Sequence, residues 1–206
     1  MRRRTFLALA LAALATSPAL AAEINVEEIL NDPASPIGGD PKGDVTIVAF
    51  LDYNCPFCKK ATPGLAKAVK EDGHVRLVYK DWPILAPSSV DGAKLALAAK
   101  YQDKYEDAHA ALMALKGRST AAQMRAAVEG AGVDMARLDA DLSAHAADIA
   151  ALIKRNNAEA ESLELQGTPV FLIGPFKVAA AIDYDEFKRV VGQARARQKG
   201  GAPSAQ

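Results

Sequence analysis

The sequence predicts an α/β fold in which a four-stranded sheet carries helices on both faces and a helical domain is inserted between two groups of strands. Three observations predict it. A strand–helix–strand pattern occupies residues 45–79, a helical pattern then fills residues 86–165, and two short strands and a helix follow. The 206 residues, half of them apolar, suffice for a fold of this kind with a substantial core.

Residues 1–21 are typical of a signal peptide. Arg2, Arg3 and Arg4 form a charged start, an apolar run follows, and Ala19-Leu20-Ala21 fits a small-residue cleavage site. The apolar run of about ten residues is too short for a bilayer, which takes roughly 20. We therefore expect a periplasmic protein. The arginines fit both a general (Sec) leader and a twin-arginine leader, so the export route stays open.

The balance of charges argues against nucleic acid as a partner. The chain has 25 basic and 25 acidic residues, and without the three leader arginines 22 basic residues remain, for a net charge of −3. A nucleic-acid binder needs a basic excess to neutralise phosphates. No segment after the leader approaches the apolar length of a membrane span.

The first part of the fold is predicted over residues 45–85, after a polar N-terminal arm at 22–44. Residues 45–51 are nearly all apolar and partly β-branched, which is typical of a central strand buried on both faces. A helical pattern follows from about 56 to 71, and a second strand from 75 to 79. Strand, crossover helix and strand make a parallel βαβ unit.

The second part of the fold is predicted over residues 166–196, after the helical insertion at 86–165. The insertion is rich in alanine, with leucine and methionine at helical spacing. Strands at 170–173 and 176–179 are separated by Gly174-Pro175, which predicts a hairpin. An amphipathic helix follows from 183 to about 195. The tail at 197–206 has no packing signal, so we expect it to be disordered.

Both cysteines of the chain lie in one motif, Cys55-Pro56-Phe57-Cys58, where a buried strand gives way to a helix. A structural disulfide is one interpretation, but closing a loop of four residues gains only ~2 kcal/mol against ~3 kcal/mol for fifteen residues. A metal site is a second. Zinc would need more ligands than this motif offers, and the three histidines are isolated, which leaves copper(I) held by two thiolates.

A redox pair is the third interpretation, and the position of the motif favours it. A cysteine at the start of a helix meets unpaired backbone N–H groups and the positive end of the helix dipole, which stabilise a thiolate. Cys55 then acts as the nucleophile, and Cys58, one turn along and more buried, resolves the mixed disulfide. Thr168-Pro169, directly before a predicted strand, is a candidate for a cis peptide bond.

The chain resembles the DsbA family of thiol-disulfide oxidoreductases. The resemblance covers about residues 44–195 and rests on the cysteine motif, the preceding Phe50-Leu51-Asp52-Tyr53-Asn54, the later Lys80-Asp81-Trp82-Pro83-Ile84-Leu85, and Gly167-Thr168-Pro169. It implies a thioredoxin fold with an inserted helical domain, a redox-active Cys55–Cys58 disulfide, and Pro169 as a cis proline. It also implies that Pro56, Phe57, Thr168 and Pro169 line the active site, with Thr168 offering backbone groups to a substrate peptide.

Three departures from the family pattern modify what the resemblance implies. Ala49 stands where many members have a glutamate that helps proton transfer to the buried sulfur. Phe57 stands where strongly oxidising members have a thiolate-stabilising histidine, so a less oxidising disulfide is expected. The short segment between the leader and the first strand leaves no room for the helical stalk of trimeric relatives, and we expect a monomer.

The sequence therefore predicts an exported thiol:disulfide oxidoreductase that needs no cofactor or metal. Its expected partners are cysteine-containing exported proteins and a membrane-bound redox partner that recycles it. We expect an oxidase, with a reductase or isomerase of the same fold as the alternative, because the motif does not state the reduction potential. An alternative from another class is a non-catalytic copper(I)-binding or chaperone protein that uses the same cysteines.

Overall fold

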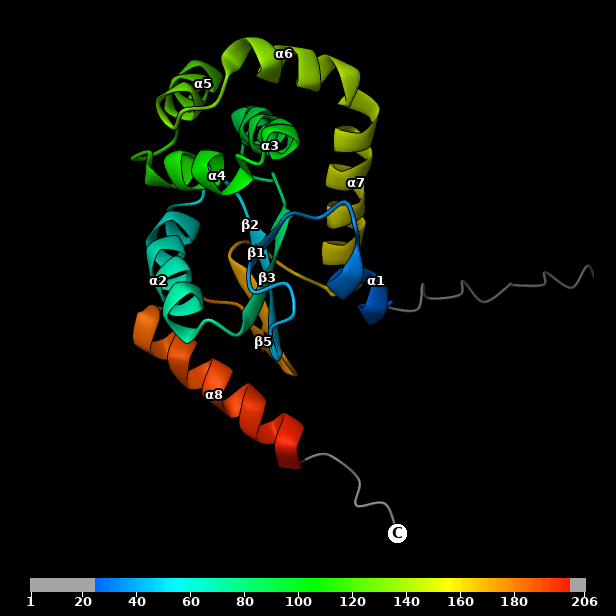
Figure 1. Cartoon of the computed structure of the whole chain (residues 1–206), viewed down its shortest axis with the longest axis vertical. Coiled ribbons are helices and arrows are strands. Elements are labelled where there is room, and N and C mark those ends of the chain that lie inside the picture. Colours follow the sequence, from blue (N-terminus) through cyan, green and yellow to red (C-terminus); the bar gives the residue numbers. More distant parts are fainter. Residues whose placement is uncertain (1–24, 201–206) are drawn as a thin grey trace, which may run out of the picture.

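The computed structural model describes residues 25–200 as one mixed sheet enclosed by helices (Figure 1). The predicted signal peptide lies outside the described residues. The strand order is β1-β3-β2-β4-β5, and the bounds are Ile37–Gly39, Val45–Leu51, Val75–Asp81, Val170–Ile173 and Phe176–Val178 for β1 to β5. Strands β2 and β3 are parallel, and every other neighbouring pair is antiparallel. The α/β class and the inserted helices are as predicted.

The central strand β2 is buried on both faces because helices cover both sides of the sheet. Helices α2 (Pro56–Asp72) and α8 (Tyr184–Gly200) lie on one side, and α1 (Val26–Asn31) and α7 (Ala146–Ser162) lie on the other (Figure 1). Alternate residues of β2 accordingly enter two different apolar clusters, Ile47 and Ala49 in the larger one and Val48 and Phe50 in the smaller one.

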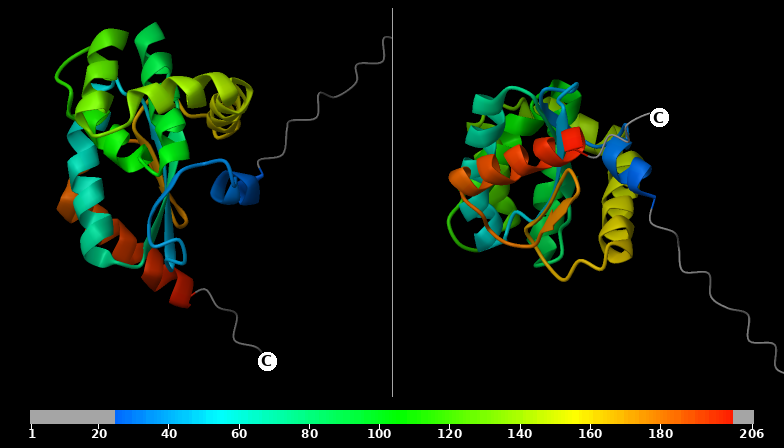
Figure 2. Two further views of the ribbon diagram at one scale, coloured as in Figure 1. Left: turned by 45° about the horizontal axis from the view of Figure 1, so that its top comes forward. Right: turned by 90° about the horizontal axis from the view of Figure 1, so that it is seen from below.

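The helical insertion caps one end of the sheet, and its last helix, α7, runs down along one face (Figure 2). It consists of α3 (Pro87–Ala99), a 3-10 turn (Lys100–Gln102), α4 (Tyr105–Ala114), α5 (Ala121–Gly130), α6 (Met135–Ala144) and α7. Fully buried leucine and methionine side chains such as Leu112, Met124 and Leu138 join these helices to the larger cluster of the sheet. None of the helices within residues 25–200 is both long enough and apolar enough to cross a bilayer.

Two features differ from the prediction. The sheet has five strands instead of four, because Ile37–Gly39 in the predicted arm pairs with β3. This strand has no alternating pattern. The second of its two glycines is required by backbone geometry: Gly39 has a φ of +66°, and a Cβ there would lie 2.4 Å from the carbonyl oxygen of Val75. Helix α8 also continues to Gly200, past the predicted start of a disordered tail. Basic residues in its last turn suit the negative end of the helix dipole.

Candidate active site

A buried carboxylate fixes the turn that delivers the cysteine motif to the end of β2. Asp52 is fully buried, and its carboxylate accepts hydrogen bonds from the backbone N–H groups of Asn54, Ile84 and Leu85 at 2.7–2.9 Å and from the hydroxyl of Ser89 at 2.7 Å. The Asp52 carbonyl oxygen accepts the N–H of Cys55 at 3.1 Å. The end of β2, the loop after β3 and the start of α3 are thereby held together around this turn.

The side chain of Asn54 holds the other flank of the turn. Its amide donates to the hydroxyls of Ser88 and Ser89, and its oxygen accepts the N–H of Ser119 from the loop after α4. Sequence reasoning did not assign functions to Asp52 and Asn54. The available signal was the position of two polar residues between a buried strand and a cysteine, where unsatisfied backbone groups need partners.

Cys55 is the N-cap residue of helix α2, directly before the first helical residue, Pro56. Its Sγ accepts the backbone N–H of Cys58 at 3.3 Å, which is the hydrogen bond of an N-cap side chain, and Pro56 occupies the first helical position. Gly73 ends the helix with a φ of +71°. Both cysteines are free thiols, and both are buried, Cys55 with 2% and Cys58 with 0% of its surface exposed.

The two thiols differ in acidity because their surroundings differ. Hydrogen bonds from the Cys58 side chain and from the N–H groups of Cys58 and Phe57, together with the nearby Thr168 side chain, lower the pKa of Cys55 to about 6, against the opposing effect of burial. Burial is the main cause that raises the pKa of Cys58 above its usual range. The helix start therefore holds one ionisable sulfur beside one that stays protonated at neutral pH.

Thr168 and Pro169 lie against the cysteines, at the entrance to β4. The peptide bond between them is cis. The thiol of Cys55 donates to the carbonyl oxygen of Thr168 at 3.2 Å. The Thr168 hydroxyl is buried and makes no hydrogen bond within the described residues. The sheet brings the two segments together, because β4 pairs antiparallel with β2, whose end carries the cysteine motif.

Phe57 lies between the cysteines and points into solvent, with 61% of its surface exposed. It lines a groove of about 580 Å³ together with Thr168, Pro169, Val170 and Ala181. Ile84 and Leu85, whose N–H groups bind Asp52, are also large apolar side chains with substantial exposure, at 44% and 40%. Exposed apolar side chains thus lie within the cysteine motif and on the loop bound to Asp52, which suits contact with a polypeptide chain.

Ala49 is buried in the same apolar cluster as Cys58, so this position of β2 supplies no carboxyl group to the cluster that holds the buried sulfur. The nearby Lys59 ammonium donates to the carbonyl oxygen of Gly117 at 2.6 Å. Burial lowers the pKa of Lys59, and the charges of Asp52 and Cys55 oppose that change.

The structure brings together the six residues that the sequence predicted for the site: Cys55, Pro56, Phe57, Cys58, Thr168 and Pro169.

The proteins that are similar to this chain in sequence or structure include several thioredoxin-like oxidoreductases. A family model for thioredoxin matches residues 31–193. A thioredoxin-like oxidoreductase from Silicibacter pomeroyi DSS-3 is 37% identical, with a TM-score of 0.78 over 84% of this chain and 98% of that one. The thiol-disulfide exchange protein alpha-DsbA2 from Wolbachia pipientis is 27% identical, with a TM-score of 0.76 over 81% and 90% of the two chains. The catalytic domain of Proteus mirabilis ScsC is 28% identical, with a TM-score of 0.73 over 82% and 94%.

Curated proteins similar to this chain are much longer. The Na(+)/H(+) antiporter NhaA 1 of Mycobacterium sp. (strain KMS) is 28% identical over 155 residues, which are 71% of this chain and 25% of the antiporter. The aligned part thus spans about a quarter of the length of that curated relative. The similarity concerns that aligned part alone.

Proposed function

This chain belongs to the thioredoxin family, and on that premise we propose that it is an exported thiol-disulfide oxidoreductase that oxidises cysteine pairs in other proteins. It has the thioredoxin-like disulfide oxidoreductase fold of its DsbA-like relatives. One observation carries the proposal: Cys55 is the N-cap residue of a helix, and its acidic thiol lies beside the buried thiol of Cys58 and the backbone of Thr168. These three groups supply a nucleophile, a resolving sulfur and a place for a substrate backbone.

The proposed reaction starts from the Cys55–Cys58 disulfide. A client thiolate attacks Cys55 Sγ, a client–Cys55 disulfide forms, and the Cys55–Cys58 bond breaks with its electron pair on Cys58 Sγ, which takes up a proton. A second client thiolate attacks the client sulfur of the mixed disulfide and expels Cys55 as a thiolate. The client cysteines are thereby oxidised to a disulfide, and Cys55 and Cys58 are reduced to a thiolate and a thiol.

The acidity of Cys55 favours the oxidising direction. A thiolate that is stabilised at neutral pH stabilises the reduced form of the pair, and a stabilised reduced form makes the disulfide a better oxidant. A pKa of about 6 lies between the values of thioredoxin, about 7, and of the strong oxidant DsbA, about 3.5. We therefore propose an oxidase of intermediate strength, with reductase or isomerase activity as the alternative.

The proposed location and partners follow from the sequence and the chemistry. The leader-like residues 1–21 support export to the periplasm, where cysteine-containing exported proteins are the available clients. The reduced pair must pass its two electrons to an oxidant before another cycle. We propose a membrane-bound redox partner for that step and a monomeric protein as the active form.

Equilibration with glutathione tests the proposed direction. The purified protein is incubated in buffers of defined ratios of reduced and oxidised glutathione, and the fraction of the Cys55–Cys58 disulfide is read by alkylation and mass spectrometry. An oxidase predicts a reduction potential well above that of thioredoxin, about −270 mV, and towards that of DsbA, about −120 mV. A potential near −270 mV would make the protein a reductase.

A further inference from the structure

A second groove adjoins the cysteine motif and shares no lining residue with the groove beside Thr168 and Pro169. It lies between the first turns of α2 and the end of α4, with a volume of about 640 Å³. We call it the lysine groove; its apolar lining includes Pro63, Ala66, Met113 and Leu115, and its basic lining consists of Lys59, Lys60 and Lys116. Pro56 also lines it, and Pro56 directly follows Cys55. The groove therefore reaches the residue next to Cys55.

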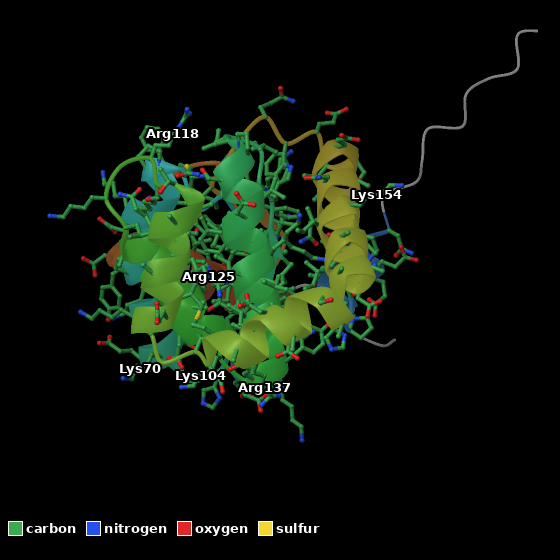
Figure 3. All side chains as sticks on the ribbon, turned by 90° about the horizontal axis from the view of Figure 1, so that it is seen from above. Lys70, Lys104, Arg118, Arg125, Arg137 and Lys154 are labelled. Carbon is green, nitrogen blue, oxygen red and sulfur yellow. The ribbon has the colours of Figure 1, made fainter. Side chains whose placement is uncertain are left out.

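The charge around the lysine groove is of one sign. No acidic residue lines it. Lys60 and Lys116 are exposed, as is Arg118 two residues further along, and none of these three takes part in a salt bridge within residues 25–200. Figure 3 shows Arg118 far from Lys70 and Lys104, which lie at the opposite edge of the molecule in that view. The nearby Asp52 carboxylate is buried and holds four hydrogen-bond donors.

The groove beside the cis proline differs from the lysine groove in charge. Its lining includes one acidic residue, Glu164, and one basic residue, Lys177. A polypeptide that crosses Cys55 would therefore meet a groove of balanced charge on one side and a cationic, apolar groove on the other. This asymmetry can distinguish the two flanks of a client cysteine.

We propose that the lysine groove binds the segment of a client protein that adjoins its cysteine, and that it selects segments carrying acidic side chains among apolar ones. The proposal rests on the proposed function, because a client cysteine at Cys55 places its neighbours over the groove. The apolar lining buries apolar side chains, and the ammonium groups attract carboxylates. The exposed basic residues at the groove and next to it, Lys60, Lys116 and Arg118, form what we call the charged rim, which acts mainly on the rate of association.

The length of the groove limits where the acidic residues stand. From Pro56 to Ala66, helix α2 advances about 15 Å at 1.5 Å per residue. An extended peptide covers that length in about five residues at roughly 3.3 Å each. The selected carboxylates therefore lie within about five residues of the client cysteine, on one side of it.

The test compares three dithiol peptides that differ only in the five residues on one side of the first cysteine, with acidic, neutral or basic side chains among constant apolar ones. Each is mixed with the oxidised protein, and loss of the Cys55–Cys58 disulfide is followed by acid quench, alkylation and mass spectrometry. The variant Lys60→Gln/Lys116→Gln/Arg118→Gln removes the rim and leaves Lys59, which is close to Cys55, in place. The matched control Lys70→Gln/Lys94→Gln/Lys154→Gln removes three exposed charges elsewhere.

The parent should react about tenfold faster with the acidic peptide than with the neutral one at low salt, and 0.5 M salt should remove most of that ratio. The rim variant should lose the ratio and the control should keep it. The ratio compares the rates of two peptides with the same protein. A change in the reduction potential of the variant affects both rates alike and therefore cancels from the ratio. Equal rates for the three peptides on the parent, or an unchanged ratio in the rim variant, would overturn the groove proposal and leave the oxidoreductase function intact. Failure to react with any peptide would overturn both.

Discussion

The Sγ atom of Cys55 lies 3.2 Å from the carbonyl oxygen of Thr168, a residue 113 positions later in the chain. This contact joins the start of α2 to the entrance of β4. The groups on either side of it perform different tasks in the proposed reaction: Cys55 exchanges disulfides, and the backbone of Thr168 is free to pair with a substrate peptide once the thiol has ionised or formed a disulfide. The side chain of Thr168 can therefore be changed while its backbone groups stay in place beside Cys55.

Thr168→Val is expected to raise the pKa of Cys55 and to leave the fold intact. The Thr168 side chain is one of the groups that lower the pKa of Cys55, and its buried hydroxyl makes no hydrogen bond within the described residues, so it is available to the Cys55 thiolate. Valine has nearly the same shape and lacks the hydroxyl. The rate of alkylation by iodoacetamide as a function of pH measures the change, and urea unfolding measures the stability. Thr46→Val, in the same sheet but away from the sulfurs, is the matched control. An unchanged pKa of Cys55 in Thr168→Val would mean that the Thr168 hydroxyl does not contribute to the acidity of this thiol.

The thiol of Cys55 should titrate near pH 6 in the reduced protein. The thiolate is the reactive form, so alkylation of Cys55 should reach half its maximal rate near that pH, whereas an ordinary cysteine does so at about pH 8.5. The pKa of Cys58 is raised, so Cys58 should not react in this range. A half-point near 8.5 would contradict the role of the helix start.

The same acidity links folding of the reduced protein to pH. The folded pKa of Cys55 is below the unfolded value, so its contribution to stability is complete above the unfolded pKa, near 9, and is lost as the pH falls through about 6. The free energy of unfolding of the reduced protein, taken relative to Cys55→Ala, should therefore rise between pH 6 and 9. Urea titrations at several pH values measure it, and the oxidised protein, which has no ionisable sulfur at this site, is the control.

Cys58→Ala should trap mixed disulfides. With an oxidised client, the Cys55 thiolate attacks one sulfur of the client disulfide and expels the other as a thiolate, which leaves a client–Cys55 disulfide. In this variant Cys58 is absent and cannot attack Cys55 to release the client, so the adduct accumulates. Non-reducing electrophoresis and mass spectrometry should find clients attached through Cys55, and Cys55→Ala should trap none. A copper(I)-binding protein would instead lose metal in both variants and trap nothing in either.

The strands and the cysteine motif could be predicted from the sequence because their signals are local. Residues 45–51 are apolar on both faces, and a Cys-x-x-Cys motif after such a strand is recognisable by itself. Strand β1 could not be predicted, because Ile37–Gly39 is held by backbone pairing with β3 and its sequence shows no strand pattern. The hydrogen bonds of Asp52 and Asn54 also escaped prediction, because most of their partners come from residues 84–119 and depend on how the insertion packs.

Removing one partner of the buried ion pair between Lys80 and Glu159 should cost more stability than replacing both partners. The Lys80 side chain is fully buried, and its ammonium lies 2.7 Å from the Glu159 carboxylate, which joins β3 to α7. Burial raises the pKa of Glu159, and Lys80 opposes that change. Lys80→Met leaves a partly buried carboxylate without its partner and should cost about 3–5 kcal/mol, whereas Lys80→Met/Glu159→Gln should recover most of the loss. Urea unfolding of the two variants measures both effects, and equal losses in both would contradict the account.

Asp81 should make the folded protein less stable as the pH rises towards neutrality. Burial raises its pKa to about 7, against the hydrogen bonds of Tyr53 and Tyr105, and the charge of Asp52 adds to the increase. Between about pH 4 and 7 the folded state thus holds a proton that the unfolded state has released, so the free energy of unfolding falls with increasing pH, by about 4 kcal/mol over the whole window.

Asp81→Asn tests this assignment because asparagine does not titrate. The Tyr105 hydroxyl lies 3.1–3.2 Å from the two Asp81 carboxylate oxygens, so it can still donate to the amide oxygen of the asparagine. The variant should be as stable as the parent or slightly less stable at pH 4, and more stable than the parent at pH 8, because it avoids the buried charge. Urea unfolding of both proteins at a series of pH values gives the two curves. Parallel curves across the window would mean that Asp81 is already ionised at pH 4, and that the tyrosine hydroxyls offset the cost of its burial.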